Sequence, residues 1–310
     1  MLSVINKIAT HNLRYNVAIA GPIGSGKTTL CDYIWKQLND IDMTHVTTDK
    51  PLNEIAHYYK EWIDHSDICK QMLVNRTNGL ISRFTLQSFI LDEWDNIMKK
   101  EPLRNFNLFE RSISECSMCF CEDLSFKEYD VLHSREYEIA SKYDIPCVDR
   151  TFGFHITESI DTADIYDEII KRINNDVDYM IHEKINSFNR IIGMKLLEPE
   201  VLVKRIGKRA RPGEEDLQLR RMREHVDVFK HAYYKFENRS ILDIPVVDYN
   251  DTENAASTVE SAREDTFAEM VGKVYNDMQK YNEAINKDSG QLYDEATAKE
   301  IDIDSMVNGC

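Results

Sequence analysis

The chain has 310 residues, of which 42% are hydrophobic and 30% charged, and its formal net charge is −16. This composition is typical of a globular protein long enough for one large α/β domain with an appendage. The negative charge should repel nucleic acid and anionic membranes, so we expect neither as a partner. The sequence has no apolar run of about 18 residues, the length that predicts a transmembrane helix.

The N-terminal residues and the cysteines bear on the cellular compartment of the protein. The N-terminus lacks the long apolar region of a signal peptide. The seven cysteines are odd in number and scattered among apolar neighbours, which suits free thiols better than a disulfide framework. We therefore expect a cytoplasmic protein. Cys116, Cys119 and Cys121 could suggest a metal site, but no second set with zinc-ligand spacing follows, and a cysteine-rich core helix is the better interpretation.

The clearest motif lies near the N-terminus. Residues 21–28 read Gly-Pro-Ile-Gly-Ser-Gly-Lys-Thr, which fits the phosphate-binding pattern G-x-x-x-x-G-K-[ST]. The apolar run at 15–20 predicts a strand before this loop, and Leu30, Ile34 and Leu38 predict a helix after it. A strand, a glycine-rich loop and a helix are the context in which this P-loop motif binds a triphosphate.

The residues of the loop have distinct expected roles. Backbone N–H groups turn towards the phosphates, and the N-terminus of the helix adds a partial positive charge. We expect Lys27 to reach the β- and γ-phosphates and the hydroxyl of Thr28 to ligate Mg²⁺. The loop therefore predicts a site for ATP and Mg²⁺, whose other candidate residues are Gly21, Gly24, Ser25, Gly26 and Thr29.

The segment after the first helix predicts a second strand. Residues 41–48 alternate weakly between apolar and polar, and the strand would end at Asp49-Lys50-Pro51, because proline stops regular structure. Residues 52–100 carry apolar side chains at helical spacing, so we expect helices there.

A third strand is predicted at Phe106–Phe109, and charged residues follow it directly. Ligands of parallel α/β sheets bind at the carboxyl ends of the strands. We therefore expect Glu110 to hold Mg²⁺ or its water, and Arg111 to fix an acceptor oxygen. A helix at 113–124 would follow.

Strands and helices continue to alternate in the second half of the chain. Such alternation predicts a mostly parallel sheet that is covered by helices on both faces. We expect the three-layer α/β sandwich of P-loop NTPases, with five parallel strands. The elements that support this are a possible strand at 145–150, a helix at 165–185, a strand at 191–197, a helix that opens at Pro199 and a strand at 242–248.

A basic island stands out against the acidic chain, with eight basic and three acidic residues between positions 204 and 223. Guanidinium groups beside a Pro-Gly hinge suit a lid, over about residues 204–216, that closes on a triphosphate. A solvated helix face is the alternative. The arginines before the hinge at Pro212-Gly213 are Arg205, Arg209 and Arg211.

The composition changes beyond residue 250. Residues 251–310 hold 14 acidic and 5 basic residues, and we treat them as a mostly helical extension of a domain formed by residues 1–250. An apolar stripe on one helix would dock this extension on the domain, or would form a contact in a homodimer. The residues of the stripe are Phe267, Val271, Val274, Met278 and Tyr281.

Taken together, these motifs resemble the deoxynucleoside kinases, which share a fold with thymidylate kinase. The P-loop, the triplet Glu110-Arg111-Ser112 and the series Arg-Ile-x-x-Arg-x-Arg at 205–211, followed by Glu214-Glu215, carry the resemblance. It covers roughly residues 15–249 in scattered blocks. The resemblance implies phosphorylation of a deoxyribonucleoside at its 5′-hydroxyl, with ATP and Mg²⁺.

The resemblance also implies roles for single residues. In that family a carboxylate after the second strand is the general base for the 5′-hydroxyl, and our candidate is Asp49, with Glu54 as the fallback. Arg111 would hold the 5′ oxygen, and Gln87 would pair with the edge of the nucleobase. Glu214 would accept a hydrogen bond from the 3′-hydroxyl.

Two other functions fit parts of the sequence. A nucleoside monophosphate kinase of the thymidylate kinase type would need an extra anion site near Arg111, and Asp149-Arg150 could imitate its Asp-Arg pair. A non-catalytic nucleotide-binding protein is the second alternative, because a family tyrosine at the 3′-hydroxyl and a tryptophan after the base carboxylate lack clear counterparts. Residues 140–185 resemble an insertion relative to shorter family members.

Overall fold

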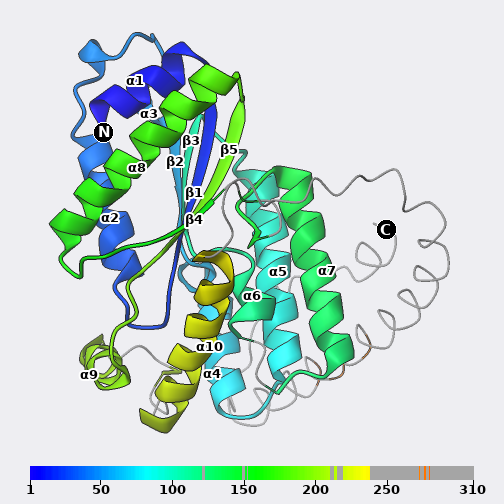
Figure 1. Ribbon diagram of the computed structural model, residues 1–310. Helices are drawn as coiled ribbons and strands as arrows, with labels where there is room; N and C mark the ends of the chain where they lie inside the picture. The colour runs from blue at the N-terminus through cyan, green and yellow to red at the C-terminus, as the bar shows by residue number, and fades with distance from the viewer. Residues whose placement is uncertain are drawn as a thin grey trace.

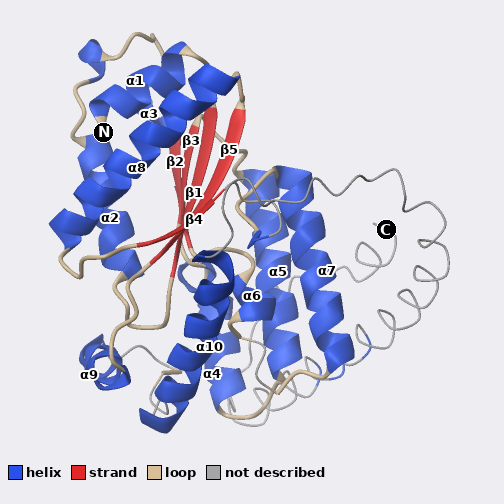
Figure 2. Ribbon diagram, in the orientation of Figure 1, coloured by secondary structure: helices blue, strands red, loops and turns tan. Residues whose placement is uncertain are grey.

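The computed structural model shows an α/β fold around a five-stranded sheet in the order β2-β3-β1-β5-β4 (Figures 1 and 2). It describes residues 1–120, 123–148, 151, 153–209, 213–214 and 219–237, with single positions at 272, 276 and 279. Every pairing is parallel, so the predicted fold class is confirmed. The strands are β1 (Arg14–Ala20), β2 (Ala56–Tyr59), β3 (Phe106–Glu110), β4 (Gly153–Ile156) and β5 (Ser187–Gly193).

Helices cover both faces of the sheet (Figure 1). One face carries α1 (Leu2–Thr10), α2 (Lys27–Asn39) and α8 (Thr162–Glu183). The other face carries α4 (Asp67–Thr77), α5 (Arg83–Lys100), α6 (Glu115–Met118) and α7 (Phe126–Tyr143). The remaining described helical elements are η1 (Met43–His45), α3 (Leu52–Ile55), η2 (Trp62–Asp64), α9 (Pro199–Arg209) and α10 (Leu219–Glu237).

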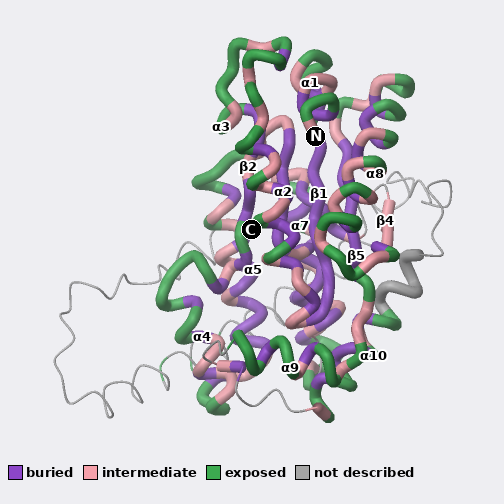
Figure 3. Tube along the Cα trace, turned by 90° about the vertical axis from the view of Figure 1, so that its left-hand side faces the viewer, coloured by how far each residue is buried: buried purple, intermediate pink, exposed green. Residues whose placement is uncertain are grey.

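Both faces of the central strand are buried (Figure 3). Along β1, Tyr15, Val17 and Ile19 pack with the helices of one layer. Ala18 and Ala20 pack with the other layer. Because a parallel strand is covered on both sides, it reads as a continuous apolar run, and this is why β1 could be predicted from sequence.

A row of asparagines crosses the buried sheet and fixes its register. The Nδ2 group of Asn16 donates to Oδ1 of Asn189 at 2.8 Å, and the Nδ2 group of Asn107 donates to Oδ1 of Asn16 at 2.7 Å. Asn16 is the register partner of both residues. A slip of one residue would leave these buried amides unpaired. The row therefore aligns β3, β1 and β5, whose carboxyl ends carry the candidate site.

The predicted second strand at 41–48 is wrong. These residues form η1 and a loop, in which the carboxylate of Asp42 accepts the N–H of Thr44 at 3.0 Å. Such local side-chain bonds compete with strand pairing. The second strand is β2, which lies inside the region predicted to be helical. With only four residues, this strand is too short to interrupt the helical spacing of apolar side chains around it.

Most later predictions are confirmed with shifted boundaries. The predicted helix at 165–185 is α8, the helix at Pro199 is α9, and the strand at 191–197 is β5, which begins and ends earlier. The helix predicted over 113–124 is reduced to α6. The possible strand at 145–150 is not formed by its described residues, and the edge strand is β4 instead.

Three predictions fall on residues outside the described ranges: the strand at 242–248, the apolar stripe between 267 and 281, and the pair Asp149-Arg150. Within the described ranges, no helix is long and apolar enough to cross a membrane. The described cysteines are buried thiols that form no disulfide with one another, namely Cys31, Cys69, Cys116, Cys119 and Cys147.

Candidate functional site

A cavity of about 460 Å³ lies at the carboxyl ends of the strands. The strand order places Glu61, after β2, at one edge of the sheet and Ile160, after β4, at the other edge. The loop after β1 lies between them. The cavity is lined by residues 23–30, by Glu61, Glu110 and Arg111, by Ile160, Thr162 and Ile165, and by Met194, Arg205 and Arg209.

The geometry of the glycine-rich loop fits a polyphosphate. Gly24 and Gly26 have φ angles of +80° and +102°, in the left-handed region that glycine adopts readily. A Cβ atom on Gly24 would lie 3.1 Å from Cγ1 of Ile206, so α9 packs closely on the loop. The hydroxyl of Ser25 is buried and has no hydrogen-bond partner among the described residues. A phosphate oxygen would satisfy it, next to the N-terminus of α2.

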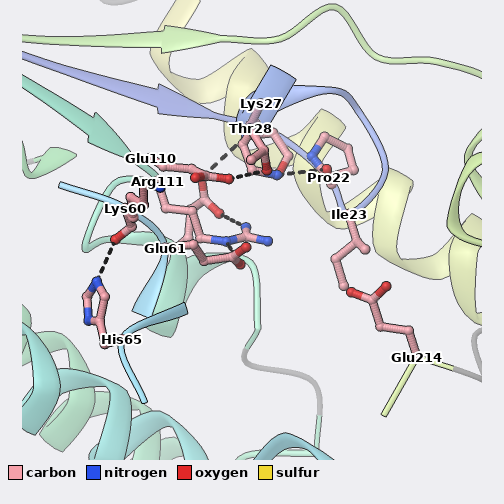
Figure 4. Close-up of polar contacts among 12 residues, drawn as sticks. Pro22, Ile23, Lys27, Thr28, Lys60, Glu61, His65, Glu110, Arg111 and Glu214 are labelled. Atoms are coloured by element: carbon pink, nitrogen blue, oxygen red, sulfur yellow. Dashed lines mark hydrogen bonds and ion pairs between the residues drawn. The ribbon is translucent and has the colours of Figure 1, made fainter. Parts of the chain in front are cut away.

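Lys27 is buried and bends back over the loop (Figure 4). Its Nζ group donates to the carbonyl oxygens of Gly21 at 2.6 Å and Pro22 at 2.9 Å. Burial, with the nearby charge of Arg111, lowers the pKa of Lys27 to about 8. Because its partners are neutral carbonyls, the ammonium group would gain a full opposite charge by turning to a phosphate.

Glu110 connects the glycine-rich loop to the sheet. Its carboxylate accepts a hydrogen bond from the hydroxyl of Thr28 and one from the hydroxyl of Tyr58, the latter at 3.0 Å. Hydroxyl and carboxylate oxygens are ligands that Mg²⁺ prefers, and Mg²⁺ usually takes one or two carboxylates together with phosphates. The structure thus brings together the two residues predicted to hold the metal, and their chemistry fits Mg²⁺.

Arg111 is held between two carboxylates (Figure 4). Its Nε group donates to Oε1 of Glu61 at 2.5 Å, and its Nη1 group donates to Oε2 of Glu115. The guanidinium also lies 5.2 Å from the ring centroid of Phe120. The backbone φ angle of Arg111 is +94°, a strained conformation of the kind found at functional sites. Nη2 bonds no described residue, so it is available to a ligand in the cavity.

Glu115 completes this cluster and was not predicted from the sequence. Its side chain is buried, and Oε1 accepts the N–H of Gly21, the first residue of the glycine-rich loop, at 3.3 Å. Burial raises the pKa of Glu115, and the neighbouring charges of Arg111 and Lys27 oppose this shift. The available signal was the short spacing of four residues from Arg111, although Arg111 itself precedes α6.

The structure puts Glu61 where Asp49 was expected. Asp49 and its fallback Glu54 are exposed and are not among the described residues that line the cavity. The prediction relied on a strand ending at residue 48, whereas the second strand ends at Tyr59. Glu61 comes two residues later, is buried and lines the cavity. Trp62 follows it directly, so a tryptophan does stand after this carboxylate.

The described arginines of the predicted lid make two kinds of contact. Nη1 of Arg205 donates to the carbonyl oxygen of Ser25 at 3.3 Å, which places this arginine on the glycine-rich loop. Nη2 of Arg209 lies 2.6 Å from both carboxylate oxygens of Glu214. Two residues predicted to bind different ligands are therefore paired with each other. Arg211 lies outside the described residues.

Gln87, predicted to contact the nucleobase, lies on α5 and is not among the described lining residues of the cavity. Its side chain is buried, and its Oε1 atom has no hydrogen-bond partner among the described residues. Its role in base recognition stays a prediction.

The chain matches no model of a known protein family and no curated protein. Among solved structures it is similar to deoxyadenosine kinase from M. mycoides with bound dCTP, at 18% sequence identity and a TM-score of 0.37, over 71% of this chain and 83% of that chain. It is also similar to the same kinase with bound dATP, at 18% identity and a TM-score of 0.37, over 72% of this chain and 88% of that chain.

Proposed function

We propose that the protein transfers the γ-phosphoryl group of ATP to the 5′-hydroxyl of a deoxyribonucleoside. One observation carries this proposal: a single cavity contains both the glycine-rich loop, with Lys27 and Thr28, and the carboxylate-arginine pair of Glu61 and Arg111. Phosphoryl transfer needs cradled phosphates, a metal site, a group that orients the acceptor and cations near the transferred group. The cavity has a candidate residue for each.

The strand order supports one orientation of the donor. The phosphates would lie over the loop after β1, with the γ-phosphate towards Glu61 and Arg111 at the β2 and β3 side. The nucleobase of ATP would then lie at the β4 side, where Ile160 is 62% exposed beside the cavity. An exposed apolar side chain at this end suits the flat face of a base.

The acceptor chemistry follows from the cluster around Arg111. Glu61 would accept the proton of the 5′-hydroxyl, a role that a well-oriented carboxylate can perform. Nη2 of Arg111 would donate to the same oxygen and keep it beside Glu61. Thr28 and Glu110 would hold Mg²⁺, which neutralises charge on the phosphates when it is bound. Lys27 and the lid arginines would hold the remaining phosphate oxygens.

The charge at the acceptor end favours a nucleoside over a monophosphate. Among the described lining residues at that end, the cation is Arg111, and Glu61 and Glu115 already pair with it. A phosphate on the acceptor would meet the carboxylate of Glu61 and a guanidinium that two carboxylates already neutralise, which is an unfavourable balance. A neutral hydroxyl would meet no such repulsion.

A substrate panel tests the proposal. The protein is incubated with MgATP and each of the four common deoxynucleosides or their 5′-monophosphates, and ADP and the nucleotide product are measured. We expect ADP release that depends on at least one nucleoside, with a 5′-monophosphate as product. Phosphorylation of a monophosphate alone would favour the thymidylate kinase alternative, and ATP binding without acceptor-dependent ADP release would favour the non-catalytic one.

A further inference from the structure

Glu115 links the glycine-rich loop to Arg111 through one buried carboxylate. Oε1 accepts the N–H of Gly21 at 3.3 Å, and Oε2 accepts Nη1 of Arg111. The carbonyl of the same Gly21 accepts Nζ of Lys27 at 2.6 Å, and Nε of Arg111 donates to Glu61 at 2.5 Å. A continuous chain of hydrogen bonds thus runs from the proposed base to the phosphate-binding lysine.

We propose that Glu115 is a positioning residue that couples the donor loop to the acceptor arginine, so that MgATP tightens the binding of the nucleoside. This inference relies on the proposed function for the identity of the two ligands. When bound MgATP orders the loop, it also fixes Gly21. Through Glu115 it then fixes Arg111. The second ligand then binds a site whose ordering cost has already been met, which gives positive cooperativity.

The bridge requires two acceptors on one side chain. An ionised carboxylate has two acceptor oxygens, and Glu115 uses one for each partner. Glutamine has nearly the same size, but it has one acceptor oxygen and an NH₂ donor. In a Glu115→Gln variant, either Gly21 or Arg111 would face another donor, so the bridge would be broken while the volume is kept.

A matched control separates coupling from simple support of α6. Glu136, on α7, is also a buried carboxylate, with 1% of its surface exposed against 4% for Glu115. It accepts the N–H and the hydroxyl of Ser117, so it also holds α6, but it contacts neither Gly21 nor Arg111. A Glu136→Gln variant therefore weakens the same short helix and leaves the bridge intact.

The test measures the binding affinity of the nucleoside that the wild type phosphorylates, by titration calorimetry, with and without the Mg²⁺ complex of β,γ-imido-ATP. We expect the analogue to tighten nucleoside binding in the wild type by a factor in the range of about 5 to 150 that is typical of coupled sites. In Glu115→Gln, this factor should fall to about 1, whatever the affinity of each ligand alone. Glu136→Gln should keep the wild-type factor, even though loss of a buried hydrogen bond to Ser117 should lower its melting temperature.

Each outcome has a clear meaning. A Glu115→Gln variant with the wild-type coupling factor would overturn the inference, and so would an equal loss in Glu136→Gln. If the wild type phosphorylates a nucleoside but shows no coupling, the inference also fails and the proposed function stands. If no nucleoside binds or is phosphorylated by the wild type, the proposed function fails and the inference fails with it.

Discussion

The donor half and the acceptor half of the cavity are built in different ways. The donor half is formed mainly by eight consecutive residues, 21–28, with Arg205 added from α9. The acceptor half is lined by Glu61 after β2 and Arg111 after β3, and Glu115 is buried behind Arg111. A local motif therefore specifies the donor half, whereas the acceptor half forms only when folding places separate strands side by side.

The two halves also differ in how their cations are balanced. Lys27 and Arg205 donate to neutral backbone carbonyls, so a phosphate would provide a better partner for each of them. Arg111 is already paired with two carboxylates. Under the proposed function, the donor half would suit an anion and the acceptor half a neutral hydroxyl. Substitutions in each half should have correspondingly different effects.

The largest effect is expected from Lys27→Ala in the donor half. Loss of one preorganised charge in a catalytic site lowers rates by about 10²–10³, and we expect at least this loss in kcat/KM for ATP. The measurement is steady-state ADP release, with circular dichroism to check the fold. Lys36→Ala, an exposed lysine on the same helix, should stay near the wild-type rate. Wild-type turnover in Lys27→Ala would refute the assigned role.

A large effect is also expected from Glu61→Gln in the acceptor half. A general base contributes about 10²–10⁴ to the rate, so kcat should fall by about 10² or more, with a smaller change in nucleoside affinity. Asp49→Asn and Glu54→Gln should stay within about twofold of wild type, because exposed surface changes are usually close to neutral. A greater loss in Asp49→Asn would restore the base predicted from sequence.

The contrast between Asp49 and Glu61 shows what sequence patterns could predict. The glycine-rich loop, β1, α8 and the parallel sheet were predictable because each depends on a local pattern of motif or apolar spacing. Glu61 was missed because its position depends on a strand of four residues, which the helical pattern around it concealed. Glu115 was missed because its two partners, Gly21 and Arg111, meet only in the folded chain.

An intermediate effect is expected from Glu110→Gln, which lies where the two halves meet. An amide keeps one oxygen but loses the negative charge, and Mg²⁺ strongly prefers charged oxygen ligands. We expect the Mg²⁺ concentration for half-maximal activity to rise by about tenfold. Tyr58→Phe removes only the hydrogen bond to Glu110, so its Mg²⁺ requirement should change less. An unchanged Mg²⁺ requirement in Glu110→Gln would place the metal elsewhere.

The smallest effect is expected at the far end of the donor half, from Ile160→Ala. Covering part of an isoleucine side chain is worth about 1 kcal/mol, which corresponds to an affinity for ATP about fivefold weaker. Inorganic tripolyphosphate has no base, so its affinity should be unchanged in the same variant. Ile68→Ala is the matched control, because Ile68 is 58% exposed on α4 and is not among the described lining residues of the cavity. Equal losses of affinity for ATP and tripolyphosphate would mean that Ile160 supports the glycine-rich loop rather than the nucleobase. ATP would then need another orientation over the sheet.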